Sequence, residues 1–353
     1  MKYYLAPYVR AFCSDKSGYF SVGSLQKYIE DSRTWVNLVK TAAYTKKPRT
    51  KEEIIEFISK ICTGEDINKI YGLISENLIK EGLYNNSDLF SRSLLYYNFF
   101  SSSPEEILKI LKDKHVVILG CGGIGNHISL HLAGSGVGHL TLVDSDIIER
   151  SNLSRQFLFS NTDIGKKKVH TAAKSLTKRY PDLIIDTIDM EVTGLEDLNQ
   201  IPACDLIVVS ADTPSELVDW VNTFCLGRQV PFINVGYIGD IAVYGPFVIP
   251  GVSGCFRCVD VSPKPVGDLP SSILEEIRDD VAIINGSGQA ASTGPINALS
   301  SAMAANDCLR FLGGYGEPLS MNRRVGVWSN ELRIQVIDTP RRSDCEVCSH
   351  VLV

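Results

Sequence analysis

The sequence predicts an α/β protein in which a doubly wound parallel sheet follows a smaller, winged-helix-like domain. After residue 104, short apolar runs alternate with helical patterns, which is typical of parallel strands joined by crossover helices. Before residue 100, three helical patterns precede a turn between two apolar runs. A chain of 353 residues accommodates two such domains, and we expect them at residues 1–100 and 104–353.

The N-terminal domain is predicted to contain three helices and a hairpin. Apolar residues recur at helical spacing in three segments, residues 34–43, 51–60 and 66–81. Gly82 is expected to end the third helix, and Asn85-Asn86 to form the turn of a wing. Residues 1–110 carry a net charge of only +2. This disfavours DNA binding and favours the addition of a peptide to the exposed strand of the wing.

The larger domain begins after a serine-rich linker at residues 101–104. Short apolar runs predict buried strands at residues 115–119, 139–143, 184–188, 206–210 and 232–235. Helices are expected from about residue 123, over 215–226 and over 295–312. Further strands are expected at 241–249 and in a closing hairpin of 325–328 with 333–337.

The composition excludes several classes of protein. Hydrophobic residues make up 44% and charged residues 22% of the chain, as in ordinary globular proteins. The net charge of −6 argues against a surface that grips nucleic acid. The first residues lack a signal-peptide core, and the longest uncharged run, 281–306, is too polar for a membrane span. We therefore expect a cytoplasmic protein with no nucleic-acid or membrane partner.

A glycine-rich turn directly follows the first strand of the larger domain and opens a helix. Its glycines are Gly120, Gly122, Gly123 and Gly125. Glycine lets the backbone approach a phosphate closely, and a helix N-terminus favours negative charge. Asp144, at the end of the second strand, lies where a ribose-binding carboxylate is expected. These features indicate a nucleotide but fit an NAD enzyme equally well.

Three charged residues favour nucleotidyl transfer over hydride transfer. Arg155 offers a planar fork and Lys168 a point charge, both suited to a phosphorus centre and departing pyrophosphate. Asp212 follows the fourth strand and is a candidate Mg²⁺ ligand, since such sites use one or two carboxylates plus phosphate oxygens. The alternatives are that Arg155 and Lys168 are solvated surface charges and that Asp212 caps a helix beginning at Ser215.

Two Cys-x-x-Cys pairs predict a structural zinc site. The four residues are Cys255, Cys258, Cys345 and Cys348. Four thiolates surround Zn²⁺ tetrahedrally and leave no position open for substrate. The alternative is four free thiols.

Several stretches together resemble the ubiquitin-activating-enzyme superfamily, in its ThiF- and MoeB-like branch. They are GCGGIG at 120–125, VDSDIIERSNLSRQ at 143–156, DIGKKK at 163–168, SAD at 210–212 and the two cysteine pairs. Three longer stretches, 116–127, 233–246 and 317–329, are similar to the microcin C peptide adenylyltransferases. This resemblance covers nearly the whole chain and implies a Rossmann-like adenylation domain with a peptide-binding N-terminal domain.

The resemblance implies roles for individual residues. The loop glycines would contact the nucleotide phosphates and Asp144 the ribose hydroxyls. Asn152 and Arg155 would contact phosphate, Lys168 the departing phosphates, and Asp212 Mg²⁺. The complete set implied for nucleotide binding is Gly120, Gly122, Gly123, Gly125, Asp144, Asp146, Asn152, Arg155, Gln156, Lys168 and Asp212, of which Arg155, Lys168 and Asp212 would be catalytic.

The resemblance also implies a reaction and its partners. A homodimer would use ATP or CTP with Mg²⁺ to activate the C-terminal asparagine of a short peptide, continuing through a succinimide to a phosphoramidate. Residues 259–293, the expected crossover loop, contain no cysteine, whereas thioester-forming relatives carry a reactive cysteine there. Adenylation of a sulfur carrier that ends in Gly-Gly, and a non-enzymatic winged-helix nucleotide sensor, remain as alternatives.

Overall fold

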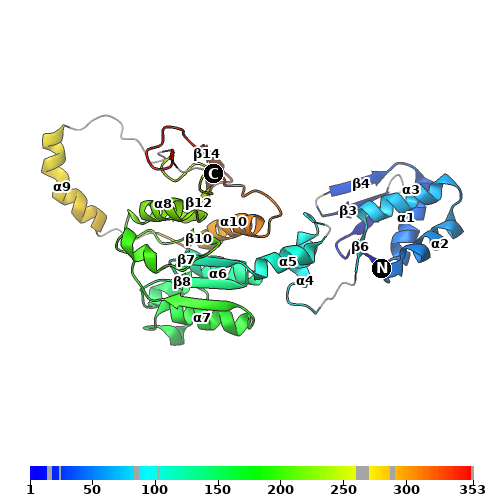
Figure 1. Cartoon of the computed structure of the whole chain (residues 1–353), viewed down its shortest axis with the longest axis horizontal. Coiled ribbons are helices and arrows are strands. Elements are labelled where there is room, and N and C mark those ends of the chain that lie inside the picture. Colours follow the sequence, from blue (N-terminus) through cyan, green and yellow to red (C-terminus); the bar gives the residue numbers. More distant parts are fainter. Residues whose placement is uncertain are drawn as a thin grey trace. The chain divides into compact units, whose positions relative to one another are not determined.

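The computed structural model describes residues 1–13, 18–23, 25–82, 87–101, 103–259, 270–286 and 291–350. The chain forms two compact units, Met1–Glu106 and Ile107–Val353 (Figure 1). Among the described residues, no helix combines the length and the apolar character that crossing a bilayer requires.

The N-terminal unit contains the three predicted helices. They are α1 (Ser32–Tyr44), α2 (Lys51–Ile61) and α3 (Glu65–Asn77). Asp31 caps α1 by accepting a hydrogen bond from the backbone of the first turn, and Thr50 begins a capping box on α2. Their apolar faces meet in one core that includes Leu38, Ile54, Ile58, Ile70 and Ile74.

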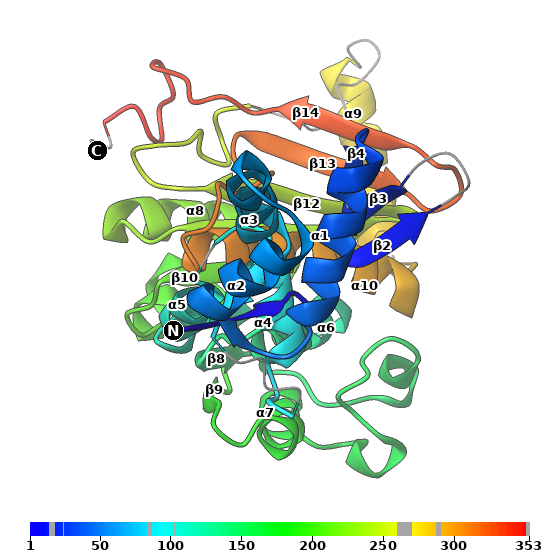
Figure 2. The ribbon, with the colours of Figure 1, turned by 90° about the vertical axis from the view of Figure 1, so that its right-hand side faces the viewer.

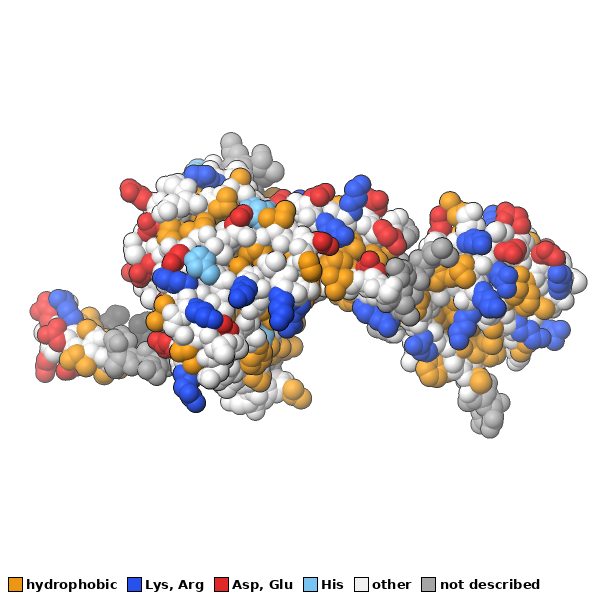
Figure 3. Space-filling model, turned by 90° about the horizontal axis from the view of Figure 1, so that it is seen from below, with side chains coloured by type: hydrophobic (Ala, Val, Ile, Leu, Met, Phe, Trp, Pro, Cys, Tyr) orange, Lys and Arg blue, Asp and Glu red, His pale blue; other side chains and the backbone are white. Residues whose placement is uncertain are grey.

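The strands of this unit differ from the prediction. One sheet has the order β5-β1-β6 and a second the order β2-β3-β4. The strands are β1 (Lys2–Leu5), β2 (Arg10–Cys13), β3 (Gly18–Val22), β4 (Leu25–Ile29), β5 (Arg49–Thr50) and β6 (Ile79–Glu81). On the face shown in Figure 3, the unit, on the right, carries basic, acidic and hydrophobic side chains interspersed.

The predicted wing is wrong in two respects. The third helix ends at Asn77 instead of running to residue 81, because residues 79–81 form β6 and pair with β1. The turn at Asn85-Asn86 lies outside the described residues, and the apolar run beyond it forms helix α4 (Ser91–Tyr97) instead of a strand. Burial of Leu95 and Tyr97 in α4 overrides the strand propensity of the aromatic residues.

A helix begins at the last residue of the predicted linker, and Ser101 and Ser103 lie outside any helix or strand. Pro104 begins α5 (Pro104–Lys112), and proline is favoured at the first position of a helix because its missing N–H has no partner there. Ser102 lies outside the described residues.

The larger unit is built on an eight-stranded sheet of order β14-β13-β12-β11-β10-β7-β8-β9. Strands β7 to β11 are parallel, as predicted, and β12 to β14 add an antiparallel edge, seen together in Figure 2. The strands are β7 (His115–Leu119), β8 (His139–Val143), β9 (Ile184–Ile188), β10 (Leu206–Val209), β11 (Phe232–Ile238), β12 (Ile241–Val248), β13 (Arg323–Trp328) and β14 (Ile334–Asp338).

Helices follow the strands of this sheet in the doubly wound manner. They are α6 (Gly123–Gly134), α7 (Lys168–Arg179), α8 (Leu217–Arg228), α9 (Ser271–Gly286) and α10 (Gly294–Leu312), with short 3₁₀ turns at Arg150–Ser154, Asn161–Asp163 and Leu195–Gln200. Helices α7 and α9 were not predicted, and α9 lies within residues 259–293, which were expected to form a loop. Helix α8 begins two residues later than predicted. Helices α6 and α10 lie side by side (Figure 1).

The order of the parallel strands predicts where a ligand binds. Strands β7 and β10 are neighbours, yet the chain leaves β7 toward β8 on one side and β10 toward β11 on the other. In open α/β sheets the crevice at such a switch point, beyond the carboxyl ends of the strands, binds the ligand. The loops after β7 and β10 carry the glycine motif and Asp212.

Candidate active site and metal centre

The glycine loop is closely packed at Gly120 and Gly125 and has free space at Gly122. Gly120 has φ of +95°, which favours glycine, and a Cβ there would lie 2.9 Å from the backbone N of Ala211. A Cβ on Gly125 would overlap the carbonyl oxygen of Gly120. A Cβ on Gly122 would meet nothing within 4 Å. The loop therefore needs two of its glycines for its own folding and has free space beside a third.

Asp212 stands beside this loop because Ala211 packs against Gly120. The Asp212 side chain is exposed, and its Oδ1 lies 3.5 Å from the hydroxyl of Thr213. The alternative role as a helix cap is wrong, since α8 begins at Leu217 with Glu216 in the capping position. A carboxylate in this position is available for a cation.

Asp144 ties the end of β8 to the glycine loop. One carboxylate oxygen accepts a hydrogen bond from the backbone N of Cys121 at 2.6 Å, and the other from the backbone N of Asp146 at 2.8 Å. The thiol of Cys121 is 1% exposed, and this burial raises its pKa well above the usual value. Cys121 is therefore a packing residue and no thiolate nucleophile.

Lys168 is a buried cation within the predicted site. Its side chain is 8% exposed, and Nζ contacts Oδ2 of Asp146 at 2.6 Å, while the Asp146 side chain is 65% exposed. The ammonium is therefore the sheltered partner and the carboxylate the solvated one. This geometry excludes the alternative that Lys168 is a solvated surface charge.

The segment after β8 brings the remaining predicted residues to the same region. Asn152 is buried and accepts a hydrogen bond from the backbone N of Glu149 at 3.1 Å. Arg155 is half-buried, and its guanidinium donates to the carbonyl of Ser151 at 2.9 Å. Gln156 is 2% exposed, and its Oε1 has no partner among the described residues.

Two buried asparagines at this site were not predicted from the sequence. Asn126 Oδ1 accepts a hydrogen bond from the backbone N of Leu158 at 2.7 Å and so holds the segment of Arg155 against α6. Asn297, in the first turn of α10, packs against Gly123. The sequence pattern places Asn126 and Asn297 near the starts of predicted helices. Their contacts depend on tertiary packing, and no sequence motif identifies them.

The four predicted cysteines meet at one place. All are buried, and their sulfur atoms lie within 4.8 Å of one another. The sulfur of Cys255 lies 3.7 Å from that of Cys345, and the sulfur of Cys258 lies 3.4 Å from that of Cys348. Tetrahedral zinc with bonds of about 2.3 Å places its sulfurs about 3.8 Å apart. The four thiols therefore fit a closed metal site.

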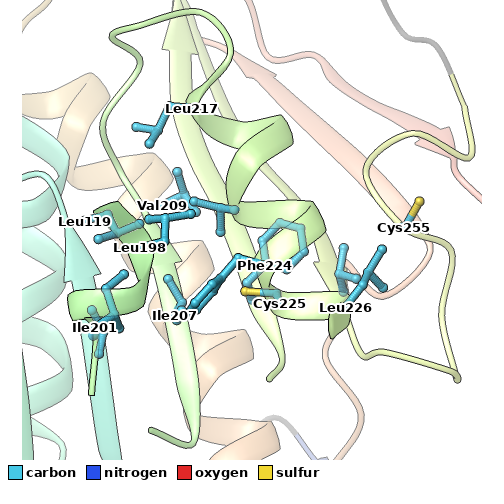
Figure 4. Packing of buried hydrophobic residues seen from close by; sticks show 14 of the residues in the cluster. Leu119, Leu198, Ile201, Ile207, Val209, Leu217, Phe224, Cys225, Leu226 and Cys255 are labelled. Carbon is cyan, nitrogen blue, oxygen red and sulfur yellow. The ribbon is translucent and has the colours of Figure 1, made fainter. Parts of the chain in front are cut away.

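The cysteine cluster is continuous with the hydrophobic core. Cys255 lies beside the end of α8, near Leu226 (Figure 4), in a cluster that also contains Phe224 and Cys225. Arg342 donates a hydrogen bond to the carbonyl of Cys258 at 3.4 Å. A metal there would close the core between the end of β12 and the segment that follows β14.

Comparisons of sequence place this geometry in a known family. The ThiF family model matches residues 91–347. The sulfur carrier protein ThiS adenylyltransferase of Escherichia coli is 27% identical over 262 residues, which cover 73% of this chain and 94% of that protein. The molybdopterin-synthase adenylyltransferase of the same organism is 29% identical over 241 residues, covering 67% and 88%.

Solved structures match the whole chain. The crystal structure of E. coli MccB with ATP has a TM-score of 0.86 at 37% identity, covering 99% of this chain and 100% of that one. The microcin C7 biosynthetic enzyme MccB in complex with N-formylated MccA has a TM-score of 0.88 at the same identity and coverage. These matches confirm the predicted resemblance to the microcin C enzymes. The chain is a nucleotidyltransferase of the adenylyltransferase type and belongs to the ThiF family.

Proposed function

We propose that this enzyme activates the C-terminal asparagine of a short peptide with ATP or CTP and converts it to a phosphoramidate-linked peptide nucleotide. In the first step, a carboxylate oxygen of the peptide attacks the α-phosphorus of the triphosphate. The bond from the α-phosphorus to the oxygen that bridges to the β-phosphorus breaks, and pyrophosphate leaves. The carboxylate is already ionised at pH 7, so this step needs no general base.

The residues around the glycine loop fit this step. The free space at Gly122 lets the backbone approach a phosphate, and Asp144 holds the loop while its position suits the ribose. Arg155, Asn152 and Gln156 would contact phosphate oxygens. Lys168 would stabilise the departing pyrophosphate by exchanging its contact with Asp146 for one with phosphate.

Asp212 is the proposed Mg²⁺ ligand, with phosphate oxygens completing the coordination. Bound Mg²⁺ would neutralise charge that develops on the phosphates. The fit rests on the exposure of Asp212 and on its place beside the glycine loop at the switch point. The four cysteines would hold a structural Zn²⁺ that takes no part in the reaction.

The similarity of the entire chain to MccB supports a peptide acceptor. The ThiS adenylyltransferase matches 73% of this chain with 94% of its own length, so about a quarter of this chain has no counterpart there. The MccB structures match 99% of this chain, N-terminal unit included. We propose that this unit grips the peptide and that the enzyme acts as a homodimer.

The later steps need no cysteine. The side-chain amide nitrogen of the asparagine would attack the activated carbonyl carbon, which releases the nucleoside monophosphate and forms a succinimide. The succinimide nitrogen would then attack the α-phosphorus of a second triphosphate, releasing pyrophosphate, and water would open the ring. The absence of cysteine from residues 259–293 agrees with this route. Within that stretch, residues 260–269 and 287–290 lie outside the described residues.

Pyrophosphate release tests the proposal directly. We expect release with a short peptide ending in asparagine, in the presence of ATP or CTP, and a product mass that includes one nucleotide. The same peptide amidated at its C-terminus is the matched control and should be inert, because it lacks the attacking carboxylate. Turnover with a Gly-Gly carrier protein alone would contradict the proposal in favour of sulfur-carrier activation.

Two alanine substitutions in the glycine loop are expected to affect different properties, one the stability of the fold and the other the affinity for nucleotide. Gly125→Ala should destabilise the protein by several kcal/mol, about the upper range for single substitutions, because its Cβ overlaps the carbonyl of Gly120. Gly122→Ala should fold with an unchanged melting temperature but bind the triphosphate more weakly, because its Cβ enters the space proposed for phosphate. Thermal melting and nucleotide titration check both, and equal affinity in Gly122→Ala would place the phosphate elsewhere.

A further inference from the structure

Two helices of the larger unit begin at the same place. Gly123 is the first residue of α6, and Asn297 in the first turn of α10 packs against it. One turn further along α10, the hydroxyl of Ser301 donates to the carbonyl of Ile124 at 3.1 Å. These contacts set the two helices side by side with their N-termini level.

Neither helix start is capped by a side chain. Gly122 occupies the N-cap of α6 and Thr293 that of α10, and neither makes a side-chain capping hydrogen bond. The first N–H groups of a helix need partners outside the helix, and each N-terminus carries a partial positive charge. Two uncapped N-termini at one place repel each other unless an anion lies between them.

The amide of Asn297 adds a donor that has no partner. Asn297 is 0% exposed, and its Nδ2 bonds none of the described residues. Ser292 donates from its hydroxyl to Oδ1 of Asn297 at 3.2 Å, which turns Nδ2 toward Gly123. A buried donor without an acceptor costs stability, so its presence at this position points to a ligand that accepts.

The same helix start also borders the segment of Arg155. A Cβ at Gly294 would lie 2.9 Å from Cζ of Phe157 and 3.5 Å from the carbonyl oxygen of Ser154. The first turn of α10 thus lies between the glycine loop and the residues proposed to contact phosphate.

We propose that the N-terminus of α10 and Nδ2 of Asn297 form a second anion-binding wall of the nucleotide site, beside the glycine loop, and donate to the α-phosphate. This inference rests on the proposed function only in placing the triphosphate at that loop. Asn297 would then hold the phosphoryl group that is transferred, beside the attacking carboxylate.

The substitution Asn297→Asp separates this role from a structural one. Aspartate keeps the shape of asparagine and the acceptor for Ser292 but replaces the donor with a negative charge. At pH 7.5 we expect the ligand-free variant to melt at a higher temperature than the wild type, because a carboxylate beside two helix N-termini is favourable. We expect its affinity for the triphosphate to fall about tenfold or more, since the carboxylate repels phosphate and a hydrogen bond to a charged group is lost.

Asn222→Asp is the matched control. Asn222 is 1% exposed, its Oδ1 accepts a hydrogen bond from the backbone N of Phe256 at 3.0 Å, and its Nδ2 has no partner among the described residues. It lies within α8, away from a helix start. Asn222→Asp should therefore melt at a lower temperature than the wild type and bind the triphosphate with unchanged affinity.

Nucleotide titrations use ATP or CTP, whichever the wild type binds, and the corresponding nucleoside. An Asn297→Asp variant that loses affinity for the triphosphate and keeps its affinity for the nucleoside supports the proposal. Unchanged triphosphate affinity, or an equal loss for the nucleoside, overturns it. If the wild type binds no nucleotide, the proposed function fails instead. Melting temperatures of the ligand-free proteins then test the anion site. If Asn297→Asp lowers the melting temperature as much as Asn222→Asp does, the anion site is overturned.

Discussion

Asp212→Ala is expected to abolish turnover without unfolding the enzyme. The Asp212 side chain is exposed and caps no helix, so its removal leaves no cavity and no unpaired buried group. A metal ion that neutralises developing phosphate charge contributes several kcal/mol, and each 1.4 kcal/mol changes a rate about tenfold. We expect pyrophosphate release to fall by about 1,000-fold or more with an unchanged melting temperature.

Glu216→Gln is the control for this prediction. Glu216 also lies between β10 and α8 and is exposed, but it follows Asp212 by four residues in the chain. It should keep normal turnover and a normal dependence on Mg²⁺ concentration. Wild-type rates in Asp212→Ala would show that the cation is held by other groups.

Cys348→Ser is expected to release the metal and to lower the melting temperature by about 10 °C or more. Four buried thiols hold the end of β12 against the segment after β14, so loss of one ligand opens a site that is part of the core. Binding of a structural metal is coupled to folding, and each kcal/mol lost changes the melting temperature of a domain of this size by about 2–4 °C. Zinc content per chain and thermal melting measure the two effects.

Cys225→Ser distinguishes loss of the metal from loss of packing. Cys225 is 0% exposed in the same hydrophobic cluster but is not one of the four ligands. It should lose some stability and keep its zinc. If Cys348→Ser retained full zinc content and its melting temperature, the metal assignment would be wrong.

The parallel sheet and the glycine loop could be predicted because their signals are local. Each buried strand is a short apolar run, as at β7 and β10, whose residues are almost all buried. The four strands before α1 gave no such signal. All the residues of β2 are exposed, and all those of β4 are exposed or half-buried, so neither strand has a buried face that would give an alternating pattern.

The sequence motifs identify the residues of the candidate site but do not predict the contacts between them. The motifs place Lys168 and Asp146 in the same region, but not the pairing that joins them in the described structure. Helix α7 was missed because its sequence, KVHTAAKSLTKR, is mostly polar. The approach of Asn297 to Gly123 joins residues far apart in the chain, and only the packing of α10 on α6 brings them together.

The position of the cysteine cluster has a consequence for how the stretch between Cys258 and Gly294 can change over evolution. Cys258 fixes the chain on one side of residues 259–293, and Gly294, packed at the start of α10, fixes it on the other. Loop-closure entropy rises slowly with length, about 0.6 kcal/mol for each doubling. Insertions and deletions between these two anchors are therefore inexpensive, and this stretch can diversify while the nucleotide chemistry stays constant.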